Sequence, residues 1–154
     1  MTDTDWHVRR VAQDEAAVAA PLFAAYLEFY GRDYDLAAAL AWLETRLSRD
    51  EAVVLVAVPP DGEPVGFTQL YPGFSSVGLR PAWVLNDLYV AEHARGQGVA
   101  ERLLSAAGQV AREAGCATLT LETGRDNEAA QRLYRRLGWV EERDYLTFTL
   151  GLRS

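Results

Sequence analysis

The sequence has little of the chemistry that sulfur and imidazole provide, since it contains one cysteine and two histidines. With a single sulfur, at Cys116, the chain can form no internal disulfide, no dithiol redox pair and no thiolate metal cluster. Cys116 stands in an apolar run, so we expect it in the core. His7 and His93 have no other metal-ligating residues at suitable spacing, and we expect no metal site.

The sequence also lacks the marks of export and of membrane insertion. Residues 1–5 are polar and acidic where a secretion signal is basic and then apolar. No apolar run approaches the length of a membrane span. We therefore expect a cytoplasmic protein with no membrane partner.

Positive charge is in deficit as well. The formal net charge is −7, so nucleic acids and anionic membranes should repel the chain, whereas cationic partners are favoured. The sequence has no repeat, low-complexity tract or linker. Its 154 residues, 49% of them apolar, can bury a substantial core, and we expect a single domain over residues 1–154.

Helical periodicity is present in four stretches of the chain. The predicted helices span residues 14–30, 35–48, 98–115 and 126–137. The first is interrupted or kinked at Pro21. The second places leucines three and four residues apart from Leu36 to Leu47, which gives it one apolar face to cover a sheet. The fourth begins at an Asp-Asn cap and ends before Gly138.

Short apolar runs bounded by turn residues predict strands. These span residues 6–11, 52–58, 64–70, 82–90, 117–123, 139–142 and 145–152. The turn at residues 59–62 joins two of them as a hairpin, residues 71–81 are predicted as a loop, and the third predicted helix crosses between two strands. We expect an α+β fold with a mixed, mostly antiparallel sheet of about seven strands covered by about four helices.

The most informative segment is Arg-Gly-Gln-Gly-Val-Ala, residues 95–100, between a predicted strand and a predicted helix. Gly96 and Gly98 let the backbone bend tightly and expose several N–H groups, and the helix adds the positive end of its dipole. This arrangement predicts an anion cradle, whose natural occupant is a phosphate-bearing cofactor. Taken alone, such a glycine pair is as often an ordinary tight turn.

Two nucleotide-binding signatures are incomplete in this segment. The dinucleotide fingerprint requires a small residue three places after Gly98, where Glu101 stands. The phosphate-loop signature requires Gly-Lys-Ser/Thr, which occurs nowhere in the chain. Both signatures are therefore disfavoured, and another part of the sequence has to identify the ligand.

A second cluster lies on the predicted helix of residues 126–137. Its pattern is Asn127-x-x-Ala130-x-x-Leu133-Tyr134-x-x-x-Gly138-Trp139. It follows Asp87-Leu88-Tyr89-Val90 and Arg95-x-x-Gly98-x-Ala100. This combination resembles the GNAT superfamily of acetyl-coenzyme A dependent N-acetyltransferases, and the resemblance covers the whole chain.

The resemblance implies a cofactor and a way of holding it. In this superfamily the strand before the glycine loop splays away from the strand after its helix, and the pantetheine arm of coenzyme A fits the gap. Contacts with the arm map to Leu88, Tyr89 and Val90. The pyrophosphate would be held by Arg95, Gly96, Gln97, Gly98, Val99 and Ala100, where alanine at the last position is a variant that the family permits. Asn127 and Ala130 would lie beside coenzyme A, although Asn127 also fits a helix cap.

Acetyl transfer to an amine requires a base, because a lysine-like amine has a pKa of about 10.4 and is protonated near neutrality. The resemblance places Asp87 and Glu122 on the two strands beside the thioester. Either carboxylate, or a water relay through one, is a candidate base. A structural hydrogen bond is the alternative role for each.

The later steps also have candidates. Backbone N–H groups near residues 88–90 would stabilise the tetrahedral oxyanion. The family assigns protonation of the leaving thiolate to the tyrosine that matches Tyr134, for which helix packing is the alternative. Arg95 is expected to contact phosphate rather than solvent alone. Direct attack in a ternary complex is expected, since Cys116 lies far from the motif and no Ser-His pair is evident.

The acceptor is expected beside the first two helices, where the sequence is acidic and aromatic. The substrate-binding candidates are Glu28, Tyr30, Asp33, Tyr34 and Asn86. Carboxylates and ring faces would hold a cationic amine of a small molecule or a peptide; a solvated turn is the alternative. The strand of residues 84–90 also resembles a branch with yeast histone and polyamine acetyltransferases, although Asn86 stands where some polyamine enzymes have glutamate.

Two other functions stay open for a chain with these motifs. A noncatalytic acyl-coenzyme A sensor would keep the glycine loop without turnover, and an amino-terminal protein acetyltransferase would select peptides. The family also implies a homodimer, with the late strands as an interface.

Overall fold

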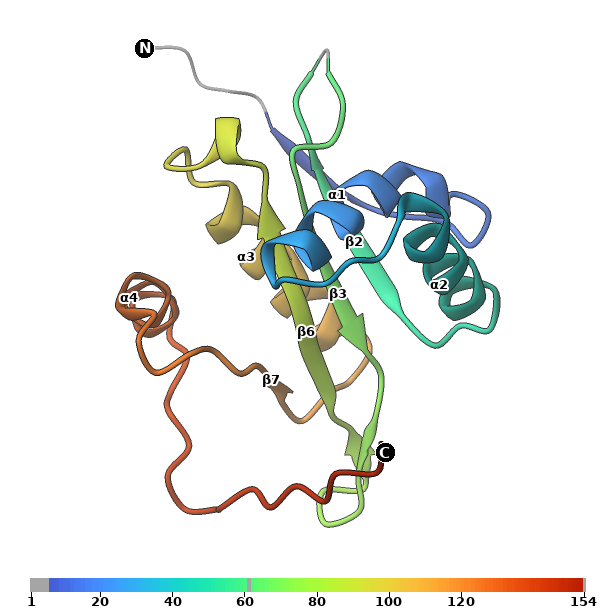
Figure 1. Cartoon of the computed structure of the whole chain (residues 1–154). Coiled ribbons are helices and arrows are strands. Elements are labelled where there is room, and N and C mark those ends of the chain that lie inside the picture. The colour runs from blue at the N-terminus through green and yellow to red at the C-terminus, as the bar shows by residue number, and fades with distance from the viewer. Residues whose placement is uncertain (1–5, 61, 154) are drawn as a thin grey trace. The chain divides into compact units, whose positions relative to one another are not determined.

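The structure of the protein is a computed structural model that describes residues 6–60 and 62–153 (Figure 1). The chain divides into two compact units, Met1–Glu122 and Thr123–Ser154, and each is described by itself. Residues 1–5, in which we found no secretion signal, and Asp61 of the predicted turn lie outside the described residues.

The larger unit contains a five-stranded sheet with the order β1-β2-β3-β6-β7. Its strands are β1 (His7–Arg10), β2 (Val53–Val58), β3 (Gly66–Tyr71), β6 (Trp83–Val90) and β7 (Leu119–Thr120). Neighbouring strands are antiparallel except for β6 and β7, which are parallel. The predicted hairpin of β2 and β3 is confirmed, and its apolar residues are buried because the two strands lie inside the sheet.

Three helices cover the sheet in this unit. They are α1 (Ala16–Phe29), α2 (Leu36–Ser48) and α3 (Val99–Glu113). Figure 1 shows α1 and α2 on one face of the sheet and α3 on the other. The main core lies under α1 and α2, where Phe23 and Leu43 pack with β2 and Phe67. Leu36 at the start of α2 is exposed, and Cys116, predicted in the core, is half-buried.

The smaller unit contains the fourth predicted helix, α4 (Glu128–Arg136). Asn127 is its N-cap, and Gly138 with φ +94° follows its end. Of the helices in the described part of the chain, none has the length and apolar character needed to cross a membrane.

Three strand predictions need correction. Residues 139–142 and 145–152 form no strand, and the predicted strand of residues 117–123 shrinks to β7. The predicted loop of residues 71–81 instead contains a small hairpin, β4 (Phe74–Ser75) and β5 (Arg80–Pro81). Apolar alternation reports which faces side chains prefer, whereas a strand also needs a hydrogen-bonded neighbour. Among the described residues of the smaller unit no strand offers one.

The sheet is open along part of β6. Only Trp83 and Val84 pair with β7, although β6 continues to Val90. Among the described residues no strand lies beside residues 85–90 on that side, so the predicted splay of the central strands is confirmed. On the other side, the register with β3 shifts between Gln69 and Leu70 and leaves Asn86 as the extra residue of a β-bulge.

Candidate functional site

Three polar side chains are buried in the described part of the chain, and all three meet at one place. Thr68 and Gln69 lie on β3, opposite Asp87 on β6. The Thr68 hydroxyl donates to the backbone oxygen of Asp87 at 2.8 Å, and Gln69 Nε2 donates to Asp87 Oδ2 at 2.8 Å. Burial of polar groups costs free energy unless they are hydrogen-bonded, so this cluster is a built feature of the sheet.

The Asp87 carboxylate accepts two more hydrogen bonds. Asn86 Nδ2 donates to its Oδ1 at 3.1 Å, and the Tyr26 phenol donates to it from α1. Burial raises the pKa of Asp87, and the hydrogen bonds from Gln69, Tyr26 and Asn86 lower it; the net pKa is above the ordinary aspartate value. Asp87 therefore takes up a proton more readily than an exposed aspartate, as a general base must.

Aromatic side chains surround this carboxylate. The Tyr26 ring stands edge-on to Phe67 and Tyr89, with ring centroids 5.8 and 6.3 Å apart. Trp42 Nε1 on α2 donates to the Tyr71 hydroxyl at 3.3 Å. Burial raises the pKa of both Tyr26 and Tyr71; the hydrogen bond from Trp42 lowers that of Tyr71, and the charge of Asp87 raises both. Both phenols therefore stay protonated near neutral pH and can donate hydrogen bonds.

The open edge of β6 presents backbone groups of Leu88 and Val90. The Ala91 N–H donates to Val65 O at 2.8 Å, so Ala91 turns its N–H toward β3. Neighbouring residues of an antiparallel strand turn their backbone groups to opposite sides, so Tyr89 also faces β3 while Leu88 and Val90 face the gap. Their N–H groups are among the donors that the resemblance implied for a pantetheine arm or an oxyanion. The N–H of Tyr89, which the resemblance also included, faces β3 instead.

The glycine loop has the backbone of an anion cradle. Gly96 has φ +76° and Gly98 has φ +81°, both in the left-handed region that side chains other than glycine rarely adopt. Gly98 is the N-cap of α3 and provides no side-chain cap, which leaves the N–H groups of the first turn without that partner. Successive N–H groups in such a turn form a concave anion site at the positive end of the helix.

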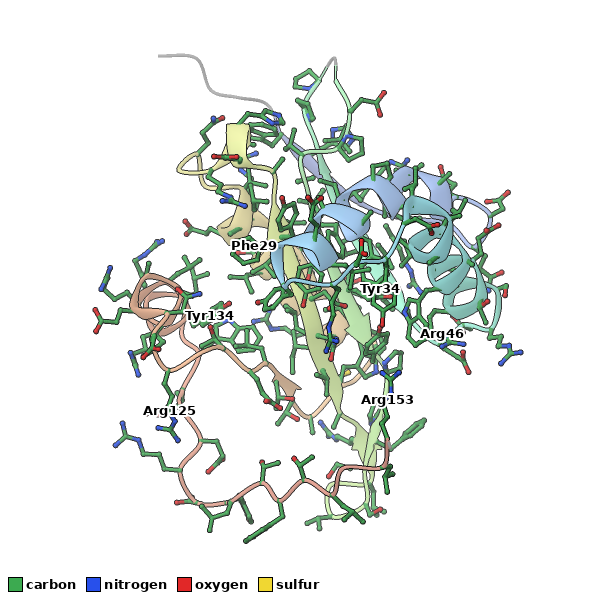
Figure 2. The ribbon with its side chains drawn as sticks, viewed as in Figure 1. Phe29, Tyr34, Arg46, Arg125, Tyr134 and Arg153 are labelled. Atoms are coloured by element: carbon green, nitrogen blue, oxygen red, sulfur yellow. The ribbon has the colours of Figure 1, made fainter. Side chains whose placement is uncertain are left out.

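The acceptor candidates at the end of α1 and in the loop before α2 are all exposed, and Tyr30 is the one with a ring contact to Tyr26. Tyr30 joins the network, because its ring lies 4.9 Å from that of Tyr26. Glu28, Asp33 and Tyr34 are exposed, at the end of α1 and in the loop before α2. Figure 2 shows Phe29 and Tyr34 in this region.

Glu122, the second candidate base, has a different setting from Asp87. It is exposed and stands two residues after the end of β7, rather than in the buried polar cluster. An exposed carboxylate keeps its hydration, so Glu122 lacks the buried, hydrogen-bonded setting of Asp87.

The candidates on α4 belong to the smaller unit. Asn127 Oδ1 accepts from the Ala130 N–H at 3.2 Å, which confirms its capping role. The half-buried Tyr134 packs near Trp139, with ring centroids 6.1 Å apart. Contacts of these residues with coenzyme A stay a prediction.

Sequence reasoning did not connect Gln69, Tyr71 or Trp42 with Asp87. The signal for Gln69 was available, because Thr68 and Gln69 are adjacent polar residues in an otherwise apolar strand. Such residues must find buried partners if the strand is central. No comparable signal marks Trp42, which reaches Tyr71 only through the packing of α2. Among the described residues no group of three or more His, Cys, Asp or Glu is placed to hold a metal ion.

Comparisons with known proteins identify the family. The sequence model described as "Acetyltransferase (GNAT) family" matches residues 19–139. The uncharacterized N-acetyltransferase YhfO of Bacillus subtilis (strain 168) is 43% identical over 146 residues, which are 95% of this chain and 97% of that protein. An aminoglycoside N(6')-acetyltransferase type 1 of Klebsiella aerogenes is 35% identical over 99 residues, 58% of this chain and 60% of that protein.

A solved structure agrees with these relatives. The crystal structure of a probable acetyltransferase is 39% identical, has a TM-score of 0.90, and covers 96% of this chain and 99% of its own. The narrower resemblance to yeast histone and polyamine enzymes stays a prediction. The glycine loop, the open strand edge and the family match together lead to one conclusion: the chain belongs to the GNAT acetyltransferase family and is an acetyl-coenzyme A dependent N-acetyltransferase.

Proposed function

We propose that this enzyme transfers the acetyl group of acetyl-coenzyme A directly to a cationic primary amine, on a small molecule or a lysine-type side chain, in a ternary complex. The observation that carries the proposal is the position of Asp87. This buried carboxylate lies on the strand with the open edge, next to Leu88, whose backbone faces the gap. The proton acceptor, Asp87, and the N–H that would donate a hydrogen bond to the oxyanion, that of Leu88, therefore belong to adjacent residues.

The cofactor would lie along β6 and end at the glycine loop. Its pantetheine amides would pair with the backbone groups of Leu88 and Val90 that face the gap, as an added strand does. Its pyrophosphate would rest on the N–H groups of residues 96–100 at the start of α3. Asn127 and Ala130 are proposed to flank it, as the family resemblance implies.

The reaction moves one acyl group, and the acceptor nitrogen loses two protons. Asp87, directly or through a water molecule, takes a proton from the ammonium group of the acceptor. The amine lone pair then attacks the thioester carbon, and the Leu88 N–H stabilises the oxyanion. The C–S bond breaks as the amide forms, and the Tyr134 phenol gives its proton to the departing thiolate. The second proton, which the nitrogen loses as the tetrahedral intermediate collapses, returns to the phenolate through solvent. Glu122 is the second candidate for the base.

The acceptor wall has the chemistry of a cation site. Glu28, Asp33, Tyr30 and Tyr34 combine negative charge with exposed rings, and each cation–ring contact is worth about 0.5–2 kcal/mol. Asn86 is exposed and is linked to Asp87 by its hydrogen bond. One relative bears the name of an aminoglycoside N-acetyltransferase, which supports a small-molecule amine as the acceptor.

The test is release of coenzyme A thiol with a panel of amines: monoamines, diamines, amino sugars and a lysine peptide. We expect turnover with at least one cationic primary amine, and its loss in Asp87→Asn. The matched control is Asp14→Asn, which changes an exposed aspartate before α1 and should keep full activity. If no amine is acetylated while coenzyme A still binds, the proposed acceptor class is wrong.

Three broader properties remain proposals of the same kind. We propose that residues 1–154 act as a single domain and that the protein works in the cytoplasm. A homodimer built through residues 139–152 is proposed from the family resemblance and from the exposed apolar side chains of that segment. These are Val140, Tyr145, Leu146, Phe148, Leu150 and Leu152. Sedimentation analysis measures the oligomeric state.

A further inference from the structure

The side chain of Arg95 is held by protein groups. Its Nε donates to the backbone oxygen of Val90 at 3.0 Å. Its guanidinium carbon lies 5.6 Å from the centroid of the Tyr89 ring and 5.8 Å from that of Phe29. We propose that Arg95 is a positioning residue, which fixes the open edge of β6 for the donor arm, and that its contribution to donor binding does not depend on the phosphates. This inference rests on the proposed cofactor site.

The bond to Val90 sets where the donor can pair with the strand. The free backbone groups of the edge are the N–H and C=O of Leu88 and Val90, and Arg95 occupies the Val90 oxygen. The Leu88 groups and the Val90 N–H are then left for the amides of the donor arm. Beyond Val90 strand-like pairing stops, so the donor must turn there toward the adjacent loop at Gly96.

Ring contacts connect the open edge of β6 with the end of α1, where the acceptor candidates lie. Phe29 is the last residue of α1, and its ring centroid lies 6.4 Å from that of Tyr89. Tyr89 in turn contacts Tyr26, which donates to Asp87. Arg95 therefore joins the entry of the glycine loop, the end of α1 and the strand that carries Asp87. One side chain sets the donor edge and the acceptor wall together.

Only a guanidinium can make this set of contacts. Its charge is spread over a group that lies within cation–ring range of two rings while Nε donates to the Val90 oxygen, whereas a lysine ammonium is a single point of charge with no Nε donor. A phosphate ligand has other requirements, because lysine keeps the charge that attracts an anion. Replacement of Arg95 by lysine therefore separates positioning from phosphate attraction.

The test compares two acetyl donors, acetyl-coenzyme A and S-acetylpantetheine, which carries no phosphate. The variants are Arg95→Lys, Arg95→Ala and Phe29→Leu, and the control is Arg112→Lys, which changes an exposed arginine in the last turn of α3. We expect both Arg95 variants to raise KM for both donors by roughly tenfold, the size of one lost charge-assisted hydrogen bond. Phe29→Leu should raise both KM values by a smaller factor, and the control should change neither.

The opposite pattern overturns the proposal. If Arg95→Lys keeps the wild-type KM, or if the loss in Arg95→Ala disappears with S-acetylpantetheine, Arg95 is a phosphate ligand. Thermal unfolding of each variant checks the fold, and we expect it to be kept because Arg95 and Phe29 are both exposed. Calorimetry of coenzyme A binding to the wild type separates failure of the Arg95 proposal from failure of the cofactor site. If coenzyme A does not bind, the proposed cofactor site itself is wrong.

Discussion

Asp87 is held as a buried carboxylate by three side-chain donors, from Gln69, Asn86 and Tyr26. Each donor favours the ionised form, while burial disfavours it more strongly. Gln69 Oε1 is buried without a hydrogen-bond partner. An amide in place of the carboxylate could donate to that oxygen after the Gln69 side chain rotates.

The raised pKa of Asp87 predicts how stability depends on pH. The unfolded chain ionises at the ordinary aspartate pKa and the folded chain at a higher one, so stability falls as pH rises between the two values. Each pKa unit of difference between the folded and unfolded chain lowers the free energy of unfolding by about 1.4 kcal/mol. We expect Asp87→Asn to gain stability relative to the wild type as pH rises above about 4. Urea unfolding across pH measures this, and a difference independent of pH would contradict it.

Tyr134 is predicted to act on the leaving group. Tyr134→Phe removes the phenol proton and keeps the ring that packs near Trp139. We expect kcat to fall about 100-fold, the scale of general acid catalysis, with little change in KM for acetyl-coenzyme A. Steady-state kinetics with both substrates measures the effects on kcat and on KM separately. An unchanged kcat would assign Tyr134 to packing alone.

The sequence indicated Asp87 as a site residue but not its surroundings. Gln69 and Tyr26 reach it only through pairing of β3 with β6 and packing of α1, and neither follows from local spacing. The tight bend of the glycine loop was predicted from the sequence, because positive φ at Gly96 and Gly98 is a local property of glycine.

At the scale of elements, Gly66 sets the distance between β3 and the start of α3. A Cβ at this position would lie 3.0 Å from Val99 Cγ1 and 3.1 Å from Leu103 Cδ1. Val99 is the first residue of α3 and follows the glycine loop. The absence of a side chain on β3 therefore lets the cofactor loop sit close to the sheet.

We expect Gly66→Ala to move the start of α3. The overpacked contact should lower the free energy of unfolding by about 1–3 kcal/mol and raise KM for acetyl-coenzyme A. The matched control is Gly108→Ala in the middle of α3, where the new Cβ meets only ordinary contacts. Alanine there should add about 0.5–1 kcal/mol of stability and leave KM unchanged. If both variants bind the cofactor equally well, Gly66 does not position the loop.

Local signals predicted the helices and the central strands. They gave wrong strand predictions where a strand depends on a hydrogen-bonded neighbour. Caps and periodicity located α2 and α4, and apolar runs located β2 and β3. Residues 139–152 alternate like a strand, but alternation contains no information about a pairing partner. The bulge at Asn86 is also a property of the pair, because it arises from the register between β3 and β6.

At the scale of the whole molecule, the charge should guide the substrate. The net charge of −7 attracts a cationic amine over a distance that salt shortens, from about 30 Å at 0.01 M to about 8 Å at 0.15 M. We expect kcat/KM for a dicationic amine to fall several-fold across this range. An uncharged hydroxylamine-type acceptor is the control and should change little. Equal salt dependence for both would contradict electrostatic guidance.

The composition also removes one side reaction from acetylation assays, the acetylation of lysine side chains of the enzyme itself. All 15 basic residues are arginine, so the sequence contains no lysine side chain that the enzyme could acetylate on itself. Mass spectrometry of the protein after turnover should therefore show no lysine acetylation. Any coenzyme A released in excess of acetylated amine then reports hydrolysis of the thioester or acetylation of the amino terminus, which the same mass spectra distinguish.

The most direct test of the account is the pH profile of kcat/KM with the best amine of the panel, in the wild type and in Asp87→Asn. We predict an acidic limb with an apparent pKa above the ordinary aspartate value, and a loss of about 100-fold in the variant at neutral pH. A variant with full activity and the same acidic limb would contradict the assignment of Asp87 as the base.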